Sequence, residues 1–323
     1  MTELLQVEDL RKYFPRGRKM LKAVDGVSFS LKAGETLGLV GESGSGKSTL
    51  GRTILRLLEP DGGRVVFDGV DLSRLDKEEL RIRRRNMQII FQDPLASLNP
   101  QMSVGQAIED PLAVHGLGSP AERRERVAQL LDIVGLGREF ANSFPHEFSG
   151  GQQQRVGIAR ALALQPSFIV CDEPVSALDV SIQAQIIALL ADLRERFSLA
   201  YLFISHDLGV IKFISDRIAV MYLGRIVQLA AKDEIFRHPL HPYTKALISS
   251  VPRIPRGHEP LLRYPTLKGE IPSAVDLPRG CRFQSRCPSV QPECLDYEPA
   301  LAEVSPGHWV ACHLHGSARA EPA

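Results

Sequence analysis

The stretch GESGSGKST at 41–49 constrains the fold of this chain more than any other. It follows the apolar run ETLGLV and precedes STLGRTILRLL, whose apolar residues recur at helical spacing. A strand, a glycine loop and a helix in this order bring backbone N–H groups onto phosphate oxygens, and the helix N-terminus adds partial positive charge. The pattern G-x-x-x-x-G-K-[ST] therefore predicts nucleotide binding, with Lys47 on the β- and γ-phosphates and Ser48 on Mg²⁺. The predicted loop residues are Gly41, Glu42, Ser43, Gly44, Ser45, Gly46, Lys47, Ser48 and Thr49.

Two carboxylates end a second apolar run, FIVCDEP at 168–174. Asp172 suits a water-mediated Mg²⁺ ligand, and Glu173 suits a base that polarises the attacking water. A pair of acids after a strand can also be a solvated turn. The phosphate loop favours the catalytic interpretation, because parallel strands deliver their residues to one edge of a sheet.

Apolar runs alternate with amphipathic helical patterns through most of the chain, which predicts an α/β fold with a mainly parallel sheet. The N-terminal residues read as short half-buried strands broken by turns, RIAVMYLGRIVQLA reads as a hairpin, and 93–145 is helical. A change to proline-rich, basic sequence places a boundary near 236–252.

Composition excludes several classes of protein. Hydrophobic content of 44%, charged content of 24% and a net charge of +1 leave no basic surplus for nucleic acid. Acidic residues interrupt the N-terminal stretch, and no run approaches the roughly 18 apolar residues of a membrane span. We therefore expect a cytoplasmic protein without a secretory leader, in which thiols stay reduced.

FSGGQQQRVGIARAL at 148–162 starts a second helix fit to bind phosphate. Here the chain resembles the ATP-binding subunits of ABC transporters, whose signature is usually LSGGQ. The other motifs of that family follow in order over about 4–235: Gln92 in IIFQDP, SALD ending at Asp179, and His206 in FISHD. Phe14 matches the aromatic that stacks on adenine, with Tyr13 as a rival.

The resemblance implies a P-loop NTPase nucleotide-binding domain at 1–240, with an antiparallel β subdomain and a helical subdomain at about 93–165. Two such domains would sandwich two ATP molecules head to tail. Ser149, Gly150, Gly151 and Gln152 would grip the γ-phosphate of ATP held by the partner. The implied catalytic residues are Glu173, His206, Gln92 and Lys47, the implied Mg²⁺ ligands are Ser48, Gln92 and Asp172, and Asp179 belongs to the nucleotide-binding set.

FQDPLASLNPQM and HPLHPYTKALISSVP are similar to bacterial oligopeptide and dipeptide importers, in particular their F-type subunit. This implies a second ATP-binding subunit, forming a heterodimer, two permeases, an extracytoplasmic solute-binding protein, and a peripheral position on the cytoplasmic membrane face. The segment after Gln92 is the implied permease contact. Importers of nickel and of glutathione share these sequence motifs, so they are alternatives for the transported solute. A soluble ABC ATPase acting on ribosomes or DNA is the alternative from another class, and a P-loop kinase would have no use for the signature helix.

Four cysteines, Cys281, Cys287, Cys294 and Cys312, follow a linker predicted at 241–280, which includes a helix and a proline-rich stretch. They form a small C-terminal module predicted at 281–315. In a reducing compartment, clustered cysteines indicate metal before disulfides. Their spacing departs from zinc ribbons and allows an iron–sulfur cluster. Some members of the resembled branch carry a [4Fe–4S] cluster there, which is our prediction, with zinc or no metal as alternatives. Cys171, inside an apolar strand, reads as a core residue.

Overall fold

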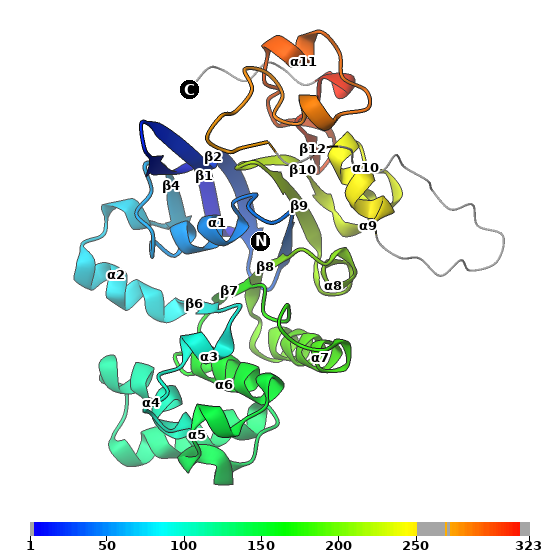
Figure 1. Cartoon of the computed structure of the whole chain (residues 1–323). Coiled ribbons are helices and arrows are strands. Elements are labelled where there is room, and N and C mark those ends of the chain that lie inside the picture. The colour runs from blue at the N-terminus through cyan, green and yellow to red at the C-terminus, as the bar shows by residue number, and fades with distance from the viewer. Residues whose placement is uncertain (1–2, 251–268, 270–271, 317–323) are drawn as a thin grey trace, which may run out of the picture. The chain divides into compact units, whose positions relative to one another are not determined.

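The computed structural model describes residues 3–250, 269 and 272–316 (Figure 1), and these residues form two compact units. The first unit comprises 3–5, 31–36 and 67–204, and the second unit comprises the other described residues. The units interleave along the sequence, so neither corresponds to one continuous stretch. The predicted domain limits at 240 and 280 stay a prediction, and the proline-rich part of the linker at 251–268 lies outside the described residues.

The first unit is built on parallel strands that are buried on both faces. β6 pairs in parallel with β7, and β7 pairs in parallel with β8, with Phe168 opposite both Met87 and Ala200. All residues of β7 and β8 are buried, as expected of a parallel sheet covered by helices. This confirms the strand predicted in FIVCDEP and the parallel pairing, whereas β6 was not predicted as a strand. These strands are β6 (Met87–Ile90), β7 (Phe168–Asp172) and β8 (Ala200–Ser205), and the two-residue β5 (Val70–Asp71) belongs to a different sheet.

Helices make up the middle of the first unit, and Figure 1 shows α3 to α6 gathered below β6. Side chains at the helix starts explain the boundaries: Ser103 and Ser119 each form a capping box with the residue three positions on. Helices α3, α4 and α5 fall within the helical range predicted at 93–145. The helices are α2 (Lys77–Arg83), α3 (Pro94–Ser97), α4 (Val104–Val114), α5 (Pro120–Ile133), α6 (Gly150–Leu162) and α7 (Val180–Phe197).

Two long strands, most of whose residues belong to the second unit, stand where the sequence predicted short ones. β1 (Glu3–Arg16) and β2 (Lys19–Lys32) each run for 14 residues around a two-residue turn. Asp9 and Gly26 adopt positive φ inside the strands, and a Cβ on Gly26 would lie 3.1 Å from Asp9 Oδ1. The prediction of short strands is wrong because these residues mark local irregularities rather than strand ends. In their sheet these strands are neighbours in the order β2-β1-β4, with β4 spanning Gly62–Phe67.

The predicted hairpin is present as β9 (Arg217–Tyr222) and β10 (Arg225–Ala231). Leu223 and Gly224 between them both have positive φ, as a type I′ turn requires. β3 (Thr36–Val40) pairs in parallel with β9. The helices of this unit are α1 (Lys47–Ile54), α8 (Leu208–Ile214), α9 (Lys232–Arg237), α10 (Pro242–Ser249) and α11 (Glu293–Asp296).

Residues 272–316, called here the C-terminal segment, extend this same sheet. β12 (His308–Val310) pairs antiparallel with β10, placing Val310 opposite Gln228, and β11 (Ala302–Ser305) pairs with β12. The segment thus belongs to the second unit together with the glycine loop. Within the described part of the chain, no helix combines the length and hydropathy needed to cross a bilayer.

Candidate active site

The glycine loop lies where predicted, between β3 and α1, in the second unit. Helix α1 begins at Lys47, and its N-cap Gly46 has φ of 104°. A Cβ on Gly46 would lie 2.0 Å from the carbonyl oxygen of Ala23, so only glycine fits. The buried Lys47 ammonium donates to the carbonyl oxygens of Gly41 at 2.8 Å and Glu42 at 3.1 Å. The Lys47 side chain thus folds back onto the backbone of the glycine loop.

The other loop residues differ in exposure. Ser43 and Gly44 are exposed, Ser45 is buried, and Ser48 and Thr49 are half-buried in the first turn of α1. The Ser45 backbone N–H donates to the Glu42 carbonyl at 3.2 Å, which closes the loop into a tight turn.

The two candidate adenine-stacking aromatics on β1 have different surroundings. The Tyr13 hydroxyl donates to the buried carboxylate of Asp25, and burial together with this bond raises the pKa of Tyr13 to about 12. The Phe14 ring is half-buried, with the Lys12 ammonium 5.4 Å from its centroid. Tyr13 is therefore fixed by a hydrogen bond from its hydroxyl, whereas Phe14 has no hydroxyl to form such a bond.

The predicted catalytic carboxylates end β7 in the first unit. Asp172 is buried, and Glu173, the next residue, is half-buried with φ of 48°. Left-handed backbone in a residue other than glycine is strained and clusters at functional sites. The Glu173 N–H donates to Ile204 at 3.1 Å, and its carboxylate accepts from Gln92 Nε2 at 3.4 Å. The structure thus brings together Gln92 and Glu173, which are 81 residues apart.

The predicted signature starts α6, also in the first unit. Ser149 caps this helix: its N–H donates to Gln152 Oε1 at 3.0 Å and its hydroxyl accepts from the Gln152 N–H at 3.4 Å. A Cβ on Gly151 would lie 2.5 Å from Ile182, so α6 approaches α7 closely there. Gly150 similarly faces Leu178 of the SALD motif, and exposed Asp179 caps α7. The signature and SALD motifs therefore pack together.

His206 follows β8 and belongs to the second unit with the glycine loop. Its side chain is exposed. The next residue, Asp207, caps α8 by accepting from the N–H groups of Gly209 at 2.6 Å and Val210 at 3.3 Å. The cap holds the backbone after His206 in a defined position.

The four C-terminal cysteines, as they lie, do not fit an iron–sulfur or zinc ligand set. Among the described residues, which include all four, no group of three or more His, Cys, Asp or Glu side chains is arranged to hold a metal ion. Burial is the main cause that raises the pKa of the Cys281 thiol to about 12 and that of Cys312 to about 11. Cys171 is a buried core residue of β7, as predicted.

Sequence reasoning missed residues that contact the glycine loop from far along the chain. The Tyr243 hydroxyl accepts from the Glu42 N–H at 2.8 Å, and Arg286 forms an ion pair with the Glu42 carboxylate. The one sequence signal for the Arg286 contact is the pair of arginines in CRFQSRC, which was interpreted only through its cysteines.

Comparison with known proteins agrees with this geometry. The ABC transporter family model matches residues 24–176, and the model for the oligopeptide/dipeptide transporter C-terminal region matches 227–294. The oligopeptide transport ATP-binding protein AppF of Bacillus subtilis (strain 168) is 53% identical, covering 97% of both chains. A putative peptide import ATP-binding protein, BAB2_0818 of Brucella abortus (strain 2308), is 50% identical over 96% of this chain and 98% of that protein.

Solved structures give the same result. The dimeric post-hydrolysis state of the ATP-binding cassette MJ0796, bound to ADP and Pi, has 34% identity and a TM-score of 0.65, covering 71% of this chain and 98% of that one. The structure of cbiO1 from Clostridium perfringens, part of the ABC transporter complex cbiONQ, has 28% identity and a TM-score of 0.66, covering 74% of this chain and 92% of that one. The chain therefore belongs to the ATP-binding proteins of the ABC transporter family, in its oligopeptide and dipeptide transporter group.

Proposed function

We propose that this chain is the ATP-hydrolysing subunit of a membrane importer for oligopeptides or dipeptides. The observation that carries the proposal is the near full-length similarity to an oligopeptide transport ATP-binding protein, in a chain that retains Lys47, Glu173 and His206. Its working position would be peripheral, on the cytoplasmic face of the membrane, because permease subunits must supply the transmembrane path.

We propose the following roles in ATP hydrolysis. Lys47 leaves the loop carbonyls of Gly41 and Glu42 to bind the β- and γ-phosphates, since phosphate oxygens are stronger acceptors than carbonyls. Glu173, held by Gln92, orients and deprotonates the attacking water, and His206 stabilises the γ-phosphate. Mg²⁺, when bound, neutralises phosphate charge. Ser48, Gln92 and Asp172 would hold it, and their oxygen donors are of the kind that Mg²⁺ prefers.

The signature implies a second ATP-binding subunit. Helix α1 has Gly46 as its N-cap, and helix α6 starts at Gly150. The chain therefore has two glycine-containing helix starts that can bind phosphate, whereas one nucleotide needs only one phosphate-binding loop. We propose that Ser149, Gly150, Gly151 and Gln152 complete the site of a partner ATPase, and that Asp179 lies beside that nucleotide. We propose that this partner is a different subunit rather than a second copy.

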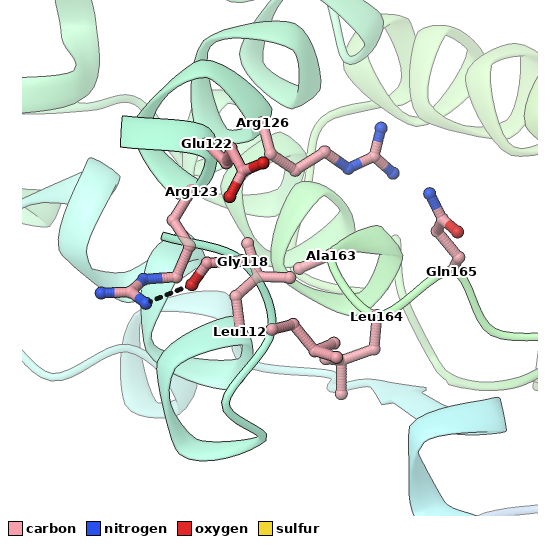
Figure 2. A pocket seen from close by; sticks show the side chains of 9 residues that line it. Leu112, Gly118, Glu122, Arg123, Arg126, Ala163, Leu164 and Gln165 are labelled. Carbon is pink, nitrogen blue, oxygen red and sulfur yellow. Dashed lines mark hydrogen bonds between the residues drawn. The ribbon is translucent and has the colours of Figure 1, made fainter. Parts of the chain in front are cut away.

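A pocket in the helical part of the first unit suits a permease loop (Figure 2). It has a volume of about 270 Å³, with apolar walls from Leu112, Leu117 and Leu164. Arg123 at its side is already paired with Glu109 at 2.8 Å. Arg126, by contrast, has no ion-pair or hydrogen-bond partner among the described residues, and burial lowers its pKa. Figure 2 shows it extending toward Gln165, where an acidic group of a permease loop would pair with it.

Reversing the charge of Arg126 tests this docking surface. Arg126→Glu should weaken binding to the detergent-solubilised permeases by roughly tenfold or more, since an acidic partner would then be repelled. Its unstimulated ATPase should be retained. Arg124→Glu on the exposed face of the same helix is the matched control. Equal permease affinity of both variants, measured by co-purification at graded concentrations, would rule out this pocket as the docking surface.

The cargo is tested in the reconstituted complex with permeases and solute-binding protein. Stimulation of ATP hydrolysis by peptides is the expected result. If a nickel chelate or glutathione stimulates ATP hydrolysis and no peptide does, that compound and not a peptide is the transported solute. Co-sedimentation with ribosomes or DNA, without recovery of membrane subunits, would instead support the soluble ABC ATPase.

The cysteine-containing C-terminal module and its [4Fe–4S] cluster remain a separate prediction, because the thiols would have to rearrange to bind iron. Visible absorbance after anaerobic purification, lost in Cys287→Ser, would support the cluster. Stoichiometric zinc in a colourless protein would show that the cysteines bind zinc instead of iron. No step of the proposed hydrolysis depends on the outcome.

A further inference from the structure

Two arginines in the C-terminal segment are buried, which is unusual for charged side chains unless they are paired. Arg282 is 6% exposed and Arg286 is 8% exposed. They lie four residues apart in CRFQSRC, on either side of the buried Phe283. Both pair with acids that lie early in the sequence, within the same unit.

Arg286 binds the glycine loop through a two-pronged ion pair. Its Nη1 lies 2.7 Å from Glu42 Oε2, and its Nη2 lies 3.0 Å from Glu42 Oε1. The guanidinium also lies 5.9 Å from the ring centroid of Tyr222. The hydrogen bond to Glu42 is the largest of the influences that raise the pKa of Arg286. Bidentate arginine–carboxylate pairs fix geometry as well as charge.

Glu42 is held at three points, two of them from late in the chain. Arg286 holds its carboxylate, and the Tyr243 hydroxyl accepts from its N–H. Its carbonyl oxygen accepts from Lys47, the residue proposed to bind the β- and γ-phosphates. A shift of the Glu42 carboxylate would therefore move a backbone that sets the position of Lys47.

Arg282 anchors the stretch that presents Arg286. Its Nη2 donates to the buried Asp25 carboxylate, and its Nε donates to Glu298 Oε1 at 2.7 Å. Asp25 also accepts from the Tyr13 hydroxyl. Within the second unit, the C-terminal segment is thus held to Asp25 of β2, which in turn binds Tyr13 of β1, as well as to the glycine loop.

We propose that Arg286 is a positioning residue for the ATP site: it neutralises Glu42 and holds the glycine loop in its binding conformation. The inference rests on the proposed ATP-binding role of this loop. A glutamate inside a loop that binds a triphosphate would repel it, and the paired guanidinium removes this repulsion. The C-terminal segment thereby contributes to nucleotide affinity without contacting the nucleotide.

Titration of a fluorescent ATP analogue tests the proposal. Arg286→Ala should raise its Kd roughly tenfold, by uncovering the Glu42 charge, and should raise the KM for ATP more than it lowers kcat. Adding Glu42→Gln to Arg286→Ala should restore most of the lost affinity, because no charge is then left uncovered. Arg279→Ala, at an exposed arginine of the same segment, is the matched control.

Salt and a conservative variant separate charge from a merely structural role. The Kd ratio between Arg286→Ala and the unmutated chain should shrink as ionic strength rises, because salt screens the repulsion. Arg286→Lys, which keeps the charge but not the two-pronged geometry, should weaken binding only roughly threefold. This variant keeps the test open if Arg286→Ala does not fold.

The results that overturn the inference are distinct from those that overturn the proposed function. If the unmutated chain binds and hydrolyses ATP while folded Arg286→Ala, or Arg286→Lys in its place, has an unchanged Kd, Arg286 has no positioning role. If adding Glu42→Gln to Arg286→Ala restores no ATP affinity, Arg286 does not act by neutralising Glu42. The same conclusion follows if the Kd ratio between Arg286→Ala and the unmutated chain does not change with ionic strength. If the unmutated chain binds no ATP, the proposed function itself fails.

Discussion

Replacing Glu173 by glutamine should abolish nearly all ATP hydrolysis while ATP binding is retained. The expected loss in kcat is roughly 10²–10⁴-fold, the contribution of a positioned general base. Glutamine keeps the size and one acceptor oxygen of the side chain but cannot take a proton. The backbone of this strained residue is held by its own N–H bond to Ile204 and by Ser176, whose N–H donates to the Glu173 carbonyl at 3.3 Å. The substitution should therefore leave the loop in place.

The measurements are phosphate release and equilibrium binding of a fluorescent ATP analogue. Glu195→Gln, at an exposed glutamate of α7 in the same unit, is the control for the loss of one carboxylate. A turnover rate of Glu173→Gln within a few-fold of the unmutated chain would refute the role of Glu173 as base. Loss of binding as well would mean that the substitution had disturbed the site instead.

Replacing Gly46 by alanine should destroy nucleotide binding by a steric route. The added Cβ would lie 2.0 Å from the Ala23 carbonyl oxygen and 2.9 Å from the Met221 side chain, so the loop or β2 has to move. Overpacking of this kind costs about 1–3 kcal/mol, and the left-handed backbone adds about 1–2 kcal/mol. The loop that positions Lys47 would be displaced, and ATP affinity and turnover should both fall below detection.

Gly44→Ala is the matched control for stability. Gly44 also has positive φ, at 77°, but no atom lies within 4 Å of its added Cβ. Thermal unfolding should therefore show a loss of about 1–2 kcal/mol for Gly44→Ala, from the backbone alone, and a larger loss for Gly46→Ala. Equal stability of the two variants would contradict the steric explanation.

Elements with strong local signals were predictable from the sequence. ETLGLV, GESGSGKST and STLGRTILRLL became β3, the glycine loop and α1, because apolar periodicity and glycine both act over a few residues. RIAVMYLGRIVQLA became a hairpin for the same reason. The N-terminal strands were predicted too short. Asp9 and Gly26 adopt positive φ inside long paired strands, and a local alternation of apolar and polar residues does not reveal that pairing.

The candidate site was predictable in its residues but not in its contacts. Motif spacing identified Gln92 and Glu173 separately, and only the fold places their side chains 3.4 Å apart across 81 residues. The iron–sulfur cluster at the cysteines stays a prediction. Four thiols in one stretch satisfy a count of ligands, but among the described residues they do not form a ligand group as they lie.

The sequence by itself determined the glycine loop, the acid-terminated strand, the signature helix and the family, since each depends on a short run of residues whose physical role is local. Only the tertiary structure decided that Arg286 lies against Glu42, 244 residues earlier, and Arg282 against Asp25, 257 residues earlier. Such pairs depend on how β12 extends the sheet at β10 and on the burial that makes an unpaired charge costly. No local pattern encodes these two conditions, because both arise only when distant segments of the chain have packed together.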